Sequence, residues 1–132
     1  MHNLEERDRH LKEQLHSLEL ARREHKKIAG KLEESQEEVN RLEGDLHTVQ
    51  RVLRDLQENK DFDPAGNDEQ LEQLTKETVR SRRLMDELKE ALSVLANLRK
   101  ESAANEKLQK EILSGIRETY EKFGWNQPEK AT

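Results

Sequence analysis

The sequence predicts an all-α protein in which two long helices fold back on each other as an antiparallel coiled-coil hairpin. Three observations lead to this fold class. Of the 132 residues, 40% are charged and only 3% are aromatic, so the chain has too little large apolar volume for a round, many-layered core. Its leucines recur in steps of three and four residues. Residues that break helices cluster at one place near the middle of the chain.

The first predicted helix covers residues 1–59. Over its second half, aliphatic residues occupy alternate steps of three and four, which is the seam of a heptad repeat. These seam residues are Ile28, Leu32, Val39, Leu42, Leu46, Val49, Leu53 and Leu56. The series extends back to His25, whose protonation near neutral pH could loosen pairing there. The earlier apolar residues Leu4, Leu11, Leu15 and Leu18 indicate a seam in a different phase. The two phases would join through Ala21 by a stammer, which locally overwinds a supercoil.

The predicted break is an acidic turn at residues 60–67. Pro64 disfavours a helical conformation for Asp63, so the first helix has to end before it. Asn67 is predicted to cap the second helix, with Gln70 reaching back toward the cap residue in a capping box. Phe62 is expected to cover the helix ends, or alternatively to serve as a possible docking residue for a partner.

The second predicted helix covers residues 68–123, and residues 124–132 are predicted to be a flexible tail. The expected seam is Leu71, Leu74, Thr78, Ser81, Met85, Leu88, Leu92, Leu95, Arg99, Ser102, Glu106, Gln109, Leu113, Ile116, Tyr120 and Phe123. Its middle part, from Arg99 to Gln109, is polar. Trp125, in the predicted tail, is a second possible docking residue, while Tyr120 and Phe123 are expected to close the open end against Leu4 and Leu11.

A hairpin is favoured because the helical segments on either side of the short break, Leu4 to Asn59 and Asp68 to Phe123, are 56 residues each. Residue i would then face a residue numbered about 127 − i, at the same height along a pair of helices that rise about 1.5 Å per residue. This matching places the polar stretch of the second helix opposite the phase change of the first, where Glu106 would meet Arg22 and Lys26. The alternative is a parallel dimer of kinked rods.

The sequence also predicts association beyond one pair of helices. In the second helix Leu84, Met85, Leu88, Leu92, Leu95 and Leu98 cover a wider arc than a single neighbour can bury. We therefore expect a second copy, which would complete a four-helix bundle, or a helix supplied by a different protein. The predicted pairing interface consists of these residues together with the aliphatic and aromatic seam positions.

Chemical functions have little support in the sequence. Cysteine is absent, and the five histidines are not spaced to bind a metal ion together, so no metal, cofactor or small-molecule substrate is expected. No phosphate-binding loop or nucleophile motif occurs, and the chain is predicted not to be an enzyme. The net charge of −5 argues against nucleic acid, and no apolar run is long enough to cross a membrane.

The overall pattern is similar to the rod segments of cytoskeletal, centrosomal, kinetochore and vesicle-tethering proteins. The resemblance implies an oligomerisation and scaffold module of a larger intracellular protein, in the cytoplasm rather than the nucleus. The first alternative is a regulatory module whose Leu84 to Leu98 face accepts a helix from another protein. The second is a tether in which the basic runs 22–27 and 80–83 bind a microtubule or an acidic membrane.

Overall fold

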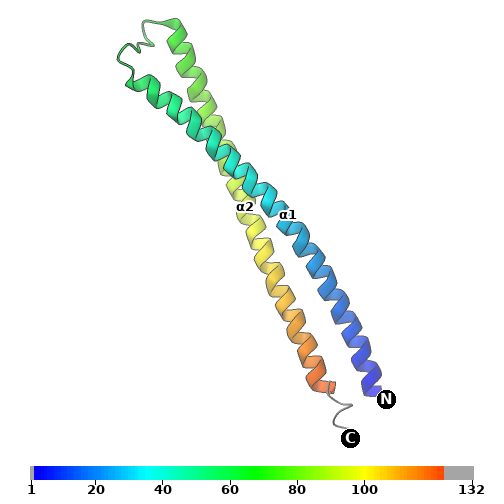
Figure 1. The fold of residues 1–132 in the computed structure, drawn as a ribbon. Coiled ribbons are helices and arrows are strands. Elements are labelled where there is room, and N and C mark those ends of the chain that lie inside the picture. Colours follow the sequence, from blue (N-terminus) through cyan, green and yellow to red (C-terminus); the bar gives the residue numbers. More distant parts are fainter. Residues whose placement is uncertain (1, 124–132) are drawn as a thin grey trace. The chain divides into compact units, whose positions relative to one another are not determined.

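The computed structural model of the chain describes residues 2–123, with side chains from Leu4 onward. Two helices make up this part: α1 (His2–Glu58) and α2 (Asp68–Phe123). They pack against each other as an antiparallel hairpin, with no strand in the described residues, which confirms the predicted fold class (Figure 1). Trp125 and the predicted tail lie outside the described residues.

The hairpin consists of two units, each containing a segment of both helices. The turn unit is Leu32–Asn97 and includes the connection between α1 and α2. The terminal unit joins residues 2–31 of α1 to residues 98–123 of α2.

The connection is held by side chains that bond to its backbone. Asn67 caps α2 as predicted, because its Oδ1 accepts hydrogen bonds from the backbone N–H groups of Glu69 (3.1 Å) and Gln70 (3.2 Å). The predicted capping box is not formed. Gln70 Oε1 instead accepts the backbone N–H of Asp63 at 2.7 Å, so it bonds four residues further back and fixes the middle of the turn. Phe62 is half-buried.

The buried positions of α1 follow one uninterrupted heptad repeat, and the predicted stammer is therefore wrong. Buried and half-buried residues step by four and three from Arg7 through Leu11, Gln14 and Leu18 all the way to Leu56. Leu15, which the stammer would have placed in the seam, is 56% exposed. Gln14 takes the seam position because its amide oxygen accepts a hydrogen bond from Thr119 of α2 at 3.0 Å.

The seam of α2 is also regular, but half of its positions were predicted one residue too late. Positions Leu74, Ser81, Leu88, Leu95, Ser102, Gln109, Ile116 and Phe123 are buried or half-buried as expected. The alternating positions are Glu77, Leu84, Ala91, Leu98, Asn105, Ile112 and Thr119. The physical reason is desolvation, because the predicted phase would have brought two charged residues, Arg99 and Glu106, into the seam. The observed phase brings in Leu98 and Asn105 there, and one charged residue, the half-buried Glu77, elsewhere.

Contacts between the helices agree with antiparallel pairing, with a systematic offset. The relation 127 − i places residue 106 opposite Ala21, and the observed contact of Ala21 is with Asn105, one residue away. Two other contacts are shifted by six residues toward the C-terminus of α2 from the position that this relation predicts. They join Gln14 to Thr119 and His10 to Phe123. Side chains of a helix tilt toward its N-terminus, so long side chains of α1 meet residues of α2 that are numbered higher than backbone height alone predicts.

The cores of the two units differ in chemistry. In the turn unit Leu42, Val49 and Leu84 form a buried aliphatic cluster, with Leu46, Leu53, Leu88 and Ala91 packed against it. In the terminal unit Leu18, Ala21 and Ile28 are buried together with two polar residues, Asn105 and Thr119. The turn unit is thus held by apolar burial, and the terminal unit combines apolar contacts with hydrogen bonds.

Candidate helix-docking surfaces

The surface of the hairpin divides into two flanks, one on each side of the buried seam. With seam residues at heptad positions a and d, the g and c rows of both helices lie on one flank, and the e and b rows lie on the other. Two observations support this assignment. Ser17, Leu108 and Gly115, all at position g, line one depression across both helices. Glu87, at position g of α2, acts electrostatically on Arg41, at position c of α1.

The e rows of the turn unit carry exposed apolar side chains and one charged residue, Glu43. The α2 row consists of Leu71, Thr78, Met85 and Leu92, and all four side chains are exposed. The matching α1 row consists of Gln36, Glu43, Gln50 and Gln57. We call these eight residues the apolar flank. Exposed apolar side chains repeated at heptad spacing beside a buried seam are typical of a helix pair that packs against further helices.

The opposite flank of the turn unit carries ion pairs. Arg41 pairs with Glu38 and Asp45 on α1, and Arg83 pairs with Glu87 on α2. The hydrogen bond from Arg41 lowers the pKa of Glu38, while Glu38, Asp45 and Glu87 raise the pKa of Arg41. Proximity of Glu87 to Arg41 was expected from the antiparallel matching. The ion pairs themselves join residues three or four apart on one helix, and exposed pairs of this kind contribute little to stability.

The predicted pairing residues fall into three groups. Ile28, Val39, Leu42, Val49, Leu84 and Leu95 are buried. Leu32, Leu46, Leu53, Leu56, Leu74, Leu88, Leu98, Ile116, Tyr120 and Phe123 are half-buried. Leu71, Met85, Leu92 and Leu113 are exposed. The last group was predicted to face α1 but lies one residue outside the seam, where α1 does not cover it.

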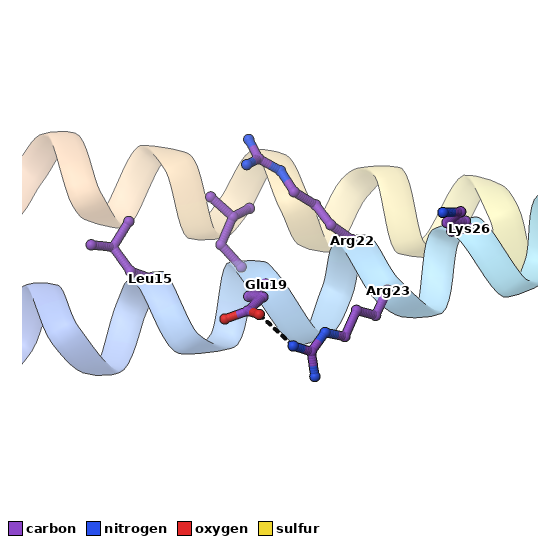
Figure 2. Close-up of a pocket in the computed structure, with 6 residues that line it drawn as sticks. Leu15, Glu19, Arg22, Arg23 and Lys26 are labelled. Carbon is purple, nitrogen blue, oxygen red and sulfur yellow. Dashed lines mark hydrogen bonds and ion pairs between the residues drawn. The ribbon is translucent and has the colours of Figure 1, made fainter.

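The terminal unit has a flank on which basic residues surround exposed leucines, here called the basic flank. Leu15 borders a depression lined also by Leu18, Glu19, Arg22, Arg23 and Lys26 (Figure 2). Arg23 is engaged by Glu19 on the same helix, whereas Figure 2 shows Arg22 extending over α2. On α2 the exposed Leu113 borders a depression lined by Lys110, Ser114 and Arg117. Leu15, Arg22 and Leu113 occupy e positions, and Lys26, Lys110 and Arg117 occupy b positions.

The other side of the terminal unit, the acidic flank, has the opposite charge. Leu108 is exposed there beside a depression lined by Glu13, Gln14, Ser17, Glu111, Ile112 and Gly115. Leu20, also exposed, occupies position c of α1 on the same flank. At the g and c positions of this flank, acidic residues outnumber basic ones. The acidic residues are Glu6, Glu13, Glu24, Glu101, Glu111 and Glu118, and the basic residues are Lys27, Lys31 and Lys122.

Hydrogen bonds cross the terminal unit at two levels that sequence reasoning did not identify. Asn105 Nδ2 donates to the backbone oxygen of Ala21 at 3.0 Å, and Gln109 Nε2 donates to Asn105 Oδ1 at 2.7 Å. Thr119 bonds to Gln14 across the pair. His25 lies on the seam as predicted, and its buried Nδ1 has no hydrogen-bond partner among the described residues. The burial of Asn105 could have been predicted from the sequence, because an uncharged amide is easier to bury than the carboxylate of the adjacent Glu106.

At the open end of the terminal unit, the ring of Phe123 makes two contacts that the sequence analysis did not predict. The Phe123 ring stacks on His10, with ring centroids 6.5 Å apart, and Lys122 Nζ lies 5.3 Å from the centroid of the Phe123 ring. Leu11 is half-buried, but Leu4 is exposed. Phe123 therefore meets a histidine that the sequence analysis did not single out.

Within residues 2–123, the side chains of histidine, aspartate and glutamate form no group that could hold a metal ion. Neither α1 nor α2, over the residues described, contains a stretch apolar enough to cross a membrane. Comparison with known proteins gives no match to any family, to any curated protein sequence or to any solved structure.

Proposed function

We propose that this chain is a non-enzymatic oligomerisation and scaffold module, in which a second copy docks on the apolar flank to make a four-helix bundle. The observation that supports this is the row of exposed Leu71, Met85 and Leu92 at heptad spacing directly beside the aliphatic core of the turn unit. Covering that row would extend the same core onto a third and a fourth helix.

The size of the apolar flank is adequate for such a contact. Leu71 and Leu92 are separated by about 30 Å along α2 at 1.5 Å per residue, and two helices are about 20 Å wide. The flank could thus bury on the order of 600 Å² per copy, near the roughly 800 Å² of a stable interface. A second copy suits it because Glu43 is the one charged side chain among its eight residues, so two identical flanks can face each other with little repulsion.

Sedimentation of the full chain over a range of concentrations tests this proposal. We expect a dimer that persists at high salt, since burial of apolar side chains holds it together. The double variant Met85→Glu, Leu92→Glu should raise the dimer dissociation constant at least about 100-fold, because two buried anchors are replaced by charges.

The matched control is Val94→Glu, on the same helix. Val94 is 49% exposed and Met85 53% exposed, but Val94 lies at position g on the charged flank. The control should leave the dimer intact, and circular dichroism should show equal helicity for all variants. A monomeric wild-type chain, or equal dissociation by Val94→Glu, would contradict the proposal. A monomer that binds a helix from another protein through Met85 and Leu92 would instead favour the regulatory binding module.

A further inference from the structure

The terminal unit carries two surfaces of opposite predominant charge, each with exposed leucines beside charged residues. On the basic flank, exposed Leu15 and Leu113 border depressions lined by Arg22, Lys26, Lys110 and Arg117. On the acidic flank, exposed Leu108 borders a depression lined by Glu13 and Glu111. Basic residues predominate on one flank despite Glu19, and acidic residues predominate on the other despite Lys27, Lys31 and Lys122, so the two flanks are complementary in their prevailing charge.

We propose that the terminal unit of one copy docks its acidic flank onto the basic flank of another copy. In this contact Leu108 enters the depression beside Leu15, and Glu13 and Glu111 face Arg22 and Lys26. The contact uses the terminal unit alone and does not depend on the apolar flank of the turn unit.

The symmetry of this contact distinguishes it from a closed dimer. Two different surfaces meet, so after docking each copy still presents one unused acidic flank or one unused basic flank. Copies can therefore be added in succession. The contact also differs in its response to salt, since charges on a solvent-exposed rim are screened within about 3 Å at 1 M salt compared with about 10 Å at 0.1 M.

Charge reversal in the full chain tests the contact, in the Met85→Glu, Leu92→Glu background so that docking on the apolar flank does not contribute. We expect the average sedimenting mass to exceed that of one chain at low salt and to fall to it at about 1 M salt. The pair Arg22→Glu, Lys26→Glu should abolish the association, and so should the pair Glu13→Lys, Glu111→Lys. All four residues are exposed, so the hairpin should remain folded.

Mixing the two charge-reversed chains is the decisive measurement. One chain then keeps an unaltered acidic flank and the other keeps an unaltered basic flank, so the mixture should recover the salt-sensitive association that each lacks alone. Reversal of Arg51 and Lys76 to glutamate in the turn unit is the matched control and should change nothing. The proposal is overturned if the parent chain shows no salt-sensitive association, if either reversed pair keeps it, or if the mixture fails to restore it.

Discussion

Replacement of Asn105 by leucine should leave the stability of the chain nearly unchanged but make the register of helix pairing in the terminal unit less well defined. Asn105 is 7% exposed and takes part in two hydrogen bonds, one to Ala21 and one from Gln109. Losing them costs about 1 kcal/mol each, but the Ala21 oxygen keeps its bond within α1 and the half-buried Gln109 can reach water. Burying a leucine side chain contributes about 1.5–3 kcal/mol. The free energy of unfolding of Asn105→Leu should thus lie within about 1 kcal/mol of wild type, whereas Asn105→Ala should lose about 2–3 kcal/mol.

The same substitution should relax the alignment of the helices, because a buried amide bonds well in only one register. Spin labels at the exposed positions His16 and Ser114 report this alignment, since a slip by one heptad moves a label by roughly 10 Å. We expect one distance in wild type and a broader or double distribution in Asn105→Leu. Urea unfolding followed by circular dichroism gives the stability. The reasoning is refuted if Asn105→Leu is as unstable as Asn105→Ala, or if its distance distribution equals that of wild type.

Three further substitutions test other parts of the hairpin. Leu42→Ala, at a side chain 1% exposed, should lower the free energy of unfolding by about 2–5 kcal/mol, while Val79→Ala on the surface should change it by less than about 0.5 kcal/mol in the same urea titration. Asn67→Ala removes the cap of α2 and should cost about 0.5–2 kcal/mol in thermal unfolding, whereas Asn67→Ser should retain most of it. Gly30→Ala with Gly44→Ala should stabilise the chain by about 1 kcal/mol per site, because an added Cβ meets nothing within 4 Å at either glycine. A loss of sedimenting mass in that variant would mean that another helix lies against these glycines.

The fold class was predictable because its signals are local. Pro64, Gly66 and Asn67 fall together in one short segment, and leucine spacing on either side is helical. Antiparallel pairing followed from the equal lengths of the two segments. The helices reverse direction at that segment, with α1 ending at Glu58 and α2 beginning at Asp68.

The seam of α2 was harder to predict because neighbouring residues have similar hydrophobicity. Leu84 and Met85, Ala91 and Leu92, and Ile112 and Leu113 are adjacent pairs, and periodicity alone does not decide which member faces α1. Charge favours the observed phase at Leu98 and Arg99 and at Asn105 and Glu106, and it opposes that phase at the single pair Glu77 and Thr78. Giving the first two of these pairs more weight than the leucine count would have located the seam.

The burial of Gln14 in place of Leu15 could not have been predicted in this way. Its partner Thr119 is 105 residues away in the sequence, and only the folded pair brings them together. The division of the terminal unit into acidic and basic flanks depends on the same seam, because a shift of one residue reassigns every exposed position to a different row. Charge balance along the sequence therefore gave no indication of it.

The contrast between the two cores implies a direction for folding and for local opening. The aliphatic cluster around Leu42 and Leu84 lies nearer the connection than the contact of Asn105 with Ala21, so the loop that must close before the cluster forms is the shorter of the two. Pairing should begin there and extend toward the chain ends, where the buried Asn105 and Thr119 lie. Amide hydrogens of residues 98–123 should accordingly exchange through partial separation of the helices, while those near Leu42 exchange only on complete unfolding. The helices of the terminal unit can therefore separate and pair again while the aliphatic cluster of the turn unit stays formed.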